Sequence, residues 1–207
     1  MFELIHNTIT TSTFNNSSSN NSSKTLNTCN VCIGLSNLDR KSFPNATHFH
    51  SEKCILGLTL TWYTENPKAL MLSNFFNLVY QQHQLNANEI TNEYLKCIKG
   101  GGKVLLYWTL NELLKIESIQ LNKEQTISLE VGTDDVESIH KLIDYYKSLS
   151  FTPIFEIETF EFGYPMQTTI EKIISSIDIN CVINESEEMK NFYSFLKTQT
   201  IKLSSKE

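Results

Sequence analysis

Apolar and polar residues alternate along residues 54–63. The apolar positions of this stretch lie two apart, at Leu56, Leu58, Leu60 and Trp62. A period of two predicts a β-strand with one buried face. A turn signal at residues 65–68 separates this stretch from a second apolar run at residues 69–79, so the two runs predict an antiparallel hairpin.

Helical spacing follows a glycine triplet at residues 100–102. Leucines recur there at helical spacing, at Leu106, Leu110, Leu113 and Leu114. This spacing predicts an amphipathic helix that ends near Ile116. Residues 126–131 alternate again and predict another strand, whose buried face carries Ile127, Leu129 and Val131.

A second helix is predicted after Asp134, because Asp134 and Glu137 have nearly the spacing of a capping box. Its apolar stripe consists of Ile139, Leu142, Ile143, Tyr146 and Leu149. We expect strand material with a bulge or turn over residues 153–162 and a helix over residues 168–177. Residues 184–207 are charged and polar, which predicts a loosely docked helix and a tail.

The N-terminal part contains a low-complexity tract of Asn, Ser and Thr at residues 10–27. Such a tract has little apolar surface to bury, so the conformational entropy that is lost on ordering it is not offset by hydrophobic burial. We therefore expect three parts: a mostly disordered segment over residues 1–27, one folded domain over residues 28–183 and a polar tail over residues 184–207.

Composition limits the classes of function. The chain has 207 residues, of which 40% are hydrophobic, enough for one ordinary domain. Its net charge of −6 argues against a nucleic-acid-binding surface. No apolar run reaches the ~18 residues of a membrane span, and the N-terminus lacks a secretory pattern. With five cysteines and no export signal, we expect reduced thiols in the cytoplasm or the nucleus.

The triplet Gly100, Gly101 and Gly102 holds three of the seven glycines of the chain. Glycine lets backbone N–H groups approach a ligand, and the helix start behind it favours anions. Nearby Lys96, Lys99 and Lys103 add positive charge, so we interpret the stretch as a pyrophosphate cradle. A flexible turn before a helix is the alternative. Neither the Walker A spacing nor Gly-x-Gly-x-x-Gly fits.

A second cluster of possible ligands consists of Cys29, Cys32, His48, His50 and Cys54. Two cysteines two residues apart, followed by His and Cys, have a spacing that can close a tetrahedral zinc site. The alternative is buried, reduced cysteines with histidines at the surface.

Two stretches resemble the GNAT superfamily of acyl-CoA-dependent N-acetyltransferases. Residues 100–106 are similar to its glycine-rich loop and following helix, and residues 142–151 are similar to its second signature, Leu-Tyr-x-x-x-Gly-Phe. Cys97 replaces the Arg or Gln that starts the loop, and Ser150 replaces the Gly of the second signature. The N-terminal strand and two helices of the family would have to come from residues 1–50. The resemblance implies an α+β fold, with a mixed, mostly antiparallel sheet flanked by helices.

The resemblance also implies a site and a mechanism. The loop that would hold the CoA pyrophosphate comprises Lys99, Gly100, Gly101, Gly102, Lys103 and Val104. Acetyl-CoA is the implied cosubstrate, and a small-molecule or peptide amine attacks it directly. Tyr146 matches the tyrosine that protonates the departing thiolate, whereas its position on an apolar stripe equally suits core packing. His83, Glu89 and Glu93 precede the loop, but solvated residues of this kind identify no general base.

Three functions therefore remain open. The first is an N-acetyltransferase that uses neither nucleic acid nor membrane as partner. The second is a degenerate GNAT-like interaction module without catalysis. The third is a zinc-binding module built from Cys29, Cys32, His50 and Cys54.

Overall fold

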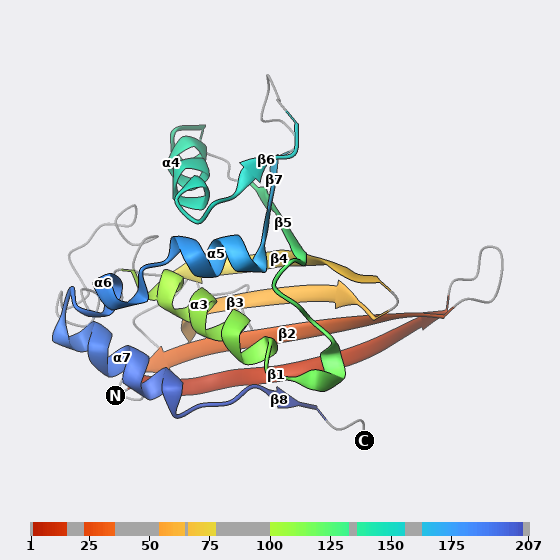
Figure 1. The fold of residues 1–207 in the computed structure, drawn as a ribbon, viewed down its shortest axis with the longest axis horizontal. Helices are drawn as coiled ribbons and strands as arrows, with labels where there is room; N and C mark the ends of the chain where they lie inside the picture. Colours follow the sequence, from red (N-terminus) through yellow and green to blue (C-terminus); the bar gives the residue numbers. More distant parts are fainter. Residues whose placement is uncertain are drawn as a thin grey trace.

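The computed structural model describes residues 2–15, 23–35, 54–64, 66–77, 100–132, 136–155 and 163–204. These ranges form one sheet with helices packed on one of its faces (Figure 1). The strands are β1 (Phe2–Asn15), β2 (Ser23–Leu35), β3 (Cys54–Tyr63), β4 (Asn66–Asn77), β5 (Thr126–Val131), β6 (Thr152–Pro153), β7 (Tyr164–Thr169) and β8 (Lys202–Leu203). The helices are α3 (Gly101–Leu113), α4 (Val136–Lys147), α5 (Ile170–Ser176), α6 (Ile179–Ile183), α7 (Glu187–Lys197) and the 3-10 helix η2 (Glu117–Ile119).

The eight described strands lie in the order β6-β7-β5-β4-β3-β2-β1-β8. Only the pairs β4/β5 and β1/β8 are parallel, and the other pairs are antiparallel. The prediction of a mixed, mostly antiparallel sheet with helices is thus confirmed. The predicted hairpin at residues 54–79 is β3 and β4, and the predicted strand at residues 126–131 is β5.

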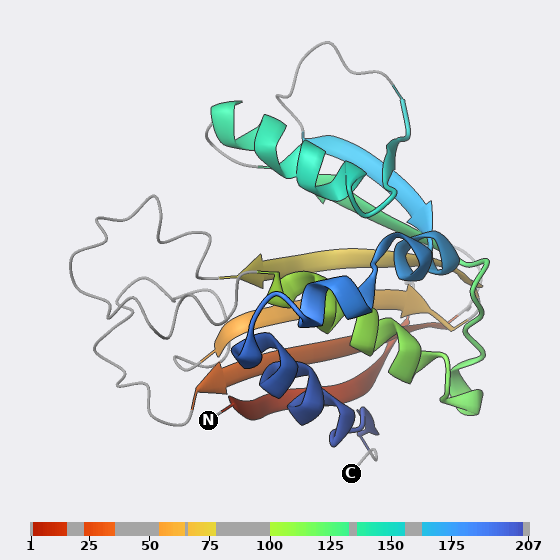
Figure 2. The same cartoon turned by 60° about the vertical axis from the view of Figure 1, so that its left-hand side comes forward.

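The parallel strands β4 and β5 separate soon after they meet. They pair only through Ala69–Met71 and Thr126–Ser128, although β4 continues to Asn77 and β5 continues to Val131. Figure 2 shows β5 and β7 rising away from β4. Helix α3 is the next described element after β4, and α4 follows β5, so both helices start at this divergence.

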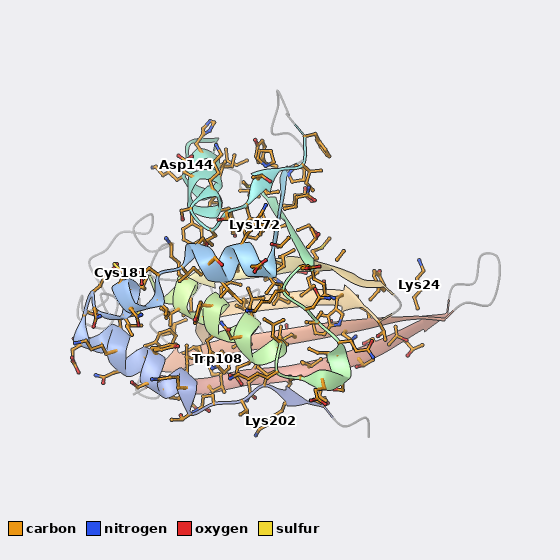
Figure 3. All side chains as sticks on the ribbon, viewed as in Figure 1. Lys24, Trp108, Asp144, Lys172, Cys181 and Lys202 are labelled. Carbon is orange, nitrogen blue, oxygen red and sulfur yellow. The ribbon has the colours of Figure 1, made fainter. Side chains whose placement is uncertain are left out.

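Helix α3 lies at the centre of the core, between strands β3 and β4 and helices α5, α6 and α7. The predicted Leu106, Leu110 and Leu113 are buried, but so are Val104 and Leu105 on the other side of the helix. Trp108, labelled in Figure 3, lies on α3 in front of the sheet. The polar residues Lys103, Asn111 and Glu112 of α3 are half-buried. The buried surface of α3 is therefore wider than the predicted amphipathic stripe, as expected for a helix that other elements cover on several sides. In the described ranges, no helix has the length and apolar character needed to cross a membrane.

The expectation of disorder over residues 10–27 is wrong for the parts that the structure describes. Residues 10–15 end β1, residues 23–27 begin β2, and residues 16–22 lie outside the described ranges. The two strands pair residue by residue, for example Thr10 with Thr28, and β2 also pairs with β3. Hydrogen bonds along both edges of β2, together with the strand preference of threonine, replace the apolar surface that the tract lacks.

The helix predicted within residues 184–207 is present as α7, but the expectation that it is loosely docked is wrong. In α7, Met189, Phe192 and Leu196 are at most 1% exposed. The ring of Phe192 lies 4.9 Å from that of Phe2, and β8 pairs with β1. Apolar residues three and four apart gave α7 a core-facing stripe inside a polar segment. In the region expected to be a strand, β6 covers two residues, and residues 156–162 lie outside the described ranges.

Candidate functional site

Gly100 makes the turn that starts α3. Its φ angle is +84°, in the left-handed region that favours glycine. Its carbonyl oxygen accepts hydrogen bonds from the backbone N–H groups of Lys103 at 3.0 Å and Val104 at 3.4 Å. The backbone N–H of Lys103, which was predicted to hold the CoA pyrophosphate, therefore already donates a hydrogen bond within the helix. The backbone N–H of Val104 does the same. The N–H groups of Gly101 and Gly102 have no acceptor within the helix, as in every first helical turn.

Gly102 is enclosed by two aromatic side chains. A Cβ atom at this position would lie 3.1 Å from Cζ of Phe75 and 3.3 Å from Oη of Tyr145. Both distances are shorter than ordinary van der Waals contacts. Gly101 and Gly102 are buried, whereas Gly100 is half-buried beside Val182. The missing side chain at residue 102 thus lets α4 approach the first turn of α3.

The predicted catalytic residue Tyr146 belongs to an aromatic cluster at the divergence of β4 and β5. We define this cluster as Phe75, Tyr145, Tyr146 and Phe151. The ring of Tyr146 lies 5.4 Å from that of Tyr145, 5.7 Å from Phe151 and 6.5 Å from Phe75. The structure therefore brings Tyr146 near the glycine turn. It also shows the close packing that the alternative interpretation of Tyr146 expected.

Burial changes the acidity of both tyrosines. It raises the pKa of Tyr146 to about 12. The pKa of Tyr145 is also raised, first by burial and then by the neighbouring Tyr146. Lys103 adds a positive charge nearby, with its Nζ atom 5.9 Å from the centre of the Tyr145 ring. Both phenols therefore keep their protons at neutral pH.

Tyr145 was missed by the sequence analysis. The motif points to the second of two adjacent tyrosines, and Tyr146 also lies on the apolar stripe. Tyr145 is nevertheless the one whose hydroxyl group lies over Gly102.

The side chain of Val104, another residue predicted for the loop, is fully buried in the core. Lys99 lies outside the described ranges, as do Lys96, Cys97, His83, Glu89 and Glu93.

Ser150 has the backbone conformation that its position in the second motif predicts for glycine. Its φ angle is +65°. Its N–H donates to the carbonyl of Lys147 at 2.9 Å, and the N–H of Phe151 donates to the carbonyl of Tyr146 at 3.1 Å. These are the two hydrogen bonds of a Schellman motif, which usually has glycine at this position. The motif thus ends α4 and sets Phe151 against Tyr146, even though glycine is replaced.

The geometry of β2 argues against a zinc site that uses both Cys29 and Cys32. Residues three apart on a strand face opposite sides of the sheet. Cys29 is fully buried in the core, and burial raises its pKa to about 12, so its thiol is not an available ligand. Cys32 is part of a disulfide bond, which corrects the expectation of reduced thiols throughout. His48, His50 and the side chain of Cys54 lie outside the described part.

Among the described residues, no three His, Cys, Asp or Glu side chains are grouped so that they could hold a metal ion. The chain matches no protein-family model, no curated protein and no solved structure. The features of the chain that bear on its function are therefore the two sequence motifs and the geometry of the glycine turn and the aromatic cluster.

Proposed function

We propose that the protein is an N-acetyltransferase that binds acetyl-CoA at the glycine turn and transfers the acetyl group to an amine. The observation that carries this proposal is the convergence of the two motif regions. Gly102, at the start of α3, and Tyr145, in α4, are in contact beside the divergence of β4 and β5. Two motifs that lie far apart in the sequence thus meet at one place in the fold.

The turn has the chemistry needed for a diphosphate. The N–H groups of Gly101 and Gly102 lack acceptors within α3, and the helix dipole adds partial positive charge. The first turn of α3 contains no acidic residue, and Lys103 contributes a cation. Together these groups favour an anion at the N-terminus of α3.

The divergence of the strands offers a second element of the proposed mechanism. After Met71, β4 pairs with β3 on one side and has no β5 partner on the other within the described residues. Its main-chain N–H groups on that edge could hydrogen-bond the acetyl carbonyl and stabilise the oxyanion that forms as the amine attacks. Direct attack requires only that two substrates be held in place, without a covalent intermediate.

The raised pKa of Tyr146 limits its role as an acid. A thiol of ordinary pKa lies roughly three to four units below a phenol of pKa about 12, so proton transfer to the thiolate is uphill. In the proposal, Tyr146 remains the candidate donor because it has the position of the tyrosine that the second motif assigns to the departing thiolate. Direct measurement of the Tyr146→Phe rate tests whether it acts.

Calorimetric titration with acetyl-CoA tests the binding step. We expect binding to the wild type and loss of binding in Gly102→Asp. The aspartate side chain would clash with Phe75 and Tyr145, and its negative charge would repel the diphosphate. Gly132→Asp is the matched control, because a Cβ there meets no atom within 4 Å and the change in charge is the same. Equal affinity in all three proteins would contradict the proposed binding site.

Release of free CoA thiol in the presence of an amine panel tests the transfer step. The net charge of −6 favours cationic acceptors such as polyamines or lysine-rich peptides. Amine-dependent thiol release supports the proposal. Acetyl-CoA binding without release with any amine of the panel would instead support a module that binds CoA without catalysis.

The close packing of the turn specifically favours a non-catalytic interaction module as the second candidate. Gly101 and Gly102 are buried, and the Tyr145 hydroxyl group occupies the space next to Gly102. If this packing persists in solution, acetyl-CoA does not reach the turn. Absence of acetyl-CoA binding by the folded wild type would favour this candidate over the enzyme.

A further inference from the structure

A cavity of about 390 Å³ lies at the end of α3 opposite the glycine turn. It is lined by residues of β1, β2 and β8, by residues of β3 and η2, and by the residue that follows each of these last two elements, so the lining comes from distant parts of the chain. Trp62, Ile119 and Leu203 form its apolar surface. The volume falls in the range of small-molecule sites, ~300–1,000 Å³. None of the residues proposed for acetyl transfer lines this cavity.

The polar centre of the cavity is Asn27, which is only 8% exposed. Its Oδ1 accepts a hydrogen bond from Oγ1 of Thr11, and its Nδ2 donates to Oγ1 of Thr64, both at 2.9 Å. A side-chain amide has two N–H donors and two acceptor lone pairs. Within the described residues, one donor and one acceptor of Asn27 therefore remain for a ligand.

The lining contains no ionisable side chain among the described residues. Its other polar members are Thr25, Ser118 and Gln120 beside Thr11 and Thr64. Lys24 and Lys202, both labelled in Figure 3, are not part of the lining. A carboxylate or phosphate would lose its hydration here without meeting an opposite charge. A purely apolar ligand would instead leave the second N–H and the second acceptor lone pair of the Asn27 amide without hydrogen bonds.

Gln120 adds an independent observation. Its φ angle is +50°, a left-handed conformation that is uncommon for a residue other than glycine. The turn is closed by its N–H, which donates to the carbonyl of Glu117 at 3.2 Å. Such strained residues are enriched where a loop holds a ligand. This one lies at the cavity, at the end of η2.

We infer that this cavity binds a small uncharged molecule with several hydroxyl groups, such as a hexitol or a hexose. Each hydroxyl group both donates and accepts hydrogen bonds, as do the amide and hydroxyl groups that line the cavity. The C–H groups of such a ligand lie against Trp62, Ile119 and Leu203. The inference is independent of acetyl transfer, because the two sites share no residue.

Ligand-observed NMR with two matched probes tests the inference on the whole chain. D-Glucitol carries a hydroxyl group on every carbon, and D-gluconate differs by one terminal carboxylate. We expect saturation transfer to D-glucitol at millimolar concentration and markedly weaker transfer to D-gluconate. Equal transfer to both probes, or transfer to neither, would overturn the inference.

Ser118→Trp should fill the cavity from η2 and reduce D-glucitol affinity roughly tenfold, as expected for the loss of one or two buried hydrogen bonds. Glu117→Trp is the control, because Glu117 is exposed on the same 3-10 helix but does not line the cavity. If Ser118→Trp does not fold, the exposed Thr64 provides a second pair of variants. Thr64→Val should weaken binding and Thr64→Ser should retain it. Unchanged binding in the cavity variants would also overturn the inference.

Discussion

The hydroxyl oxygen of Tyr145 lies 3.3 Å from the point where a Cβ atom would stand on Gly102. The first turn of α3 and the last turns of α4 can approach this closely only because residue 102 has no side chain. Tyr146, the tyrosine of the second motif, lies beside this contact and packs edge-to-face on Phe151. The glycine turn and the tyrosine pair therefore form one packing unit, whose disruption we expect to affect both stability and ligand binding.

Gly102→Ala should destabilise the protein. The added methyl group meets Phe75 at 3.1 Å and Tyr145 at 3.3 Å, so both rings must shift. Overpacking of this kind lowers the free energy of unfolding by ~1–3 kcal/mol. Urea unfolding of this variant and of Gly132→Ala gives the comparison, because a Cβ at Gly132 meets no atom within 4 Å. An equal effect of the two substitutions would contradict the close packing at Gly102.

Tyr146→Phe and Tyr145→Phe should separate catalysis from packing. If Tyr146 protonates the thiolate, its variant loses turnover by a factor of ~10²–10⁴ while acetyl-CoA affinity stays nearly constant. Tyr145 lies against the glycine turn where acetyl-CoA is proposed to bind, so its variant should change acetyl-CoA affinity more than the rate of the bound complex. Steady-state kinetics and calorimetry measure the two effects. An unchanged rate in Tyr146→Phe assigns this residue to the core alone.

Ser150→Gly should stabilise the protein by about 1 kcal/mol. Ser150 has a φ angle of +65°, which costs a residue with a side chain roughly 1 kcal/mol more than glycine. Ser148→Gly is the control with the opposite expected sign. Ser148 has no positive φ angle, and its Oγ donates a hydrogen bond to the carbonyl of Tyr145 at 2.6 Å. Glycine at residue 148 therefore removes this hydrogen bond. It also increases the conformational entropy of the unfolded chain, so both effects destabilise the fold. Thermal unfolding midpoints of both variants decide the comparison.

Stability should fall at alkaline pH, in part through Tyr146. Burial raises its pKa to about 12, above the ordinary value of ~10. A pKa that is raised in the folded state adds to the free energy of unfolding. This contribution is fully present below pH ~10 and is lost as the pH rises toward about 12. Tyr145 and Cys29 shift in the same direction, so the wild-type decline is shared.

Urea unfolding of the wild type and of Tyr146→Phe across this pH range isolates the contribution of Tyr146. The variant should show a smaller loss of unfolding free energy between pH ~10 and ~12. Identical pH profiles would mean that the Tyr146 phenol has the same pKa in the folded and unfolded chains.

The local periodicity was sufficient to predict β3, β4, β5 and α4. In β3, β5 and α4 the buried face is visible as a period of two or as a helical stripe, because neighbours in sequence determine which side chains share a face. Strand β4 was recognised as an apolar run after a turn signal. The prediction failed where the periodic signal was weak. Residues 10–15 and 23–27 form strands, although their threonines, asparagines and serines carry no apolar pattern, because β2 bonds to partners on both sides.

The sequence by itself determined the glycine turn, the end of α4 and the bounds of β3 and β5, because these depend on backbone preferences of a few adjacent residues. Strand β4 begins three residues earlier than predicted, inside the expected turn. Only the tertiary structure decided that Tyr145 covers Gly102, that Cys29 and Cys32 face opposite sides of the sheet, and that Asn27 lies in a cavity with η2 and β8. Each of these relationships joins residues through strand pairing or helix packing. Such long-range contacts depend on the whole fold and leave no periodic trace in the sequence.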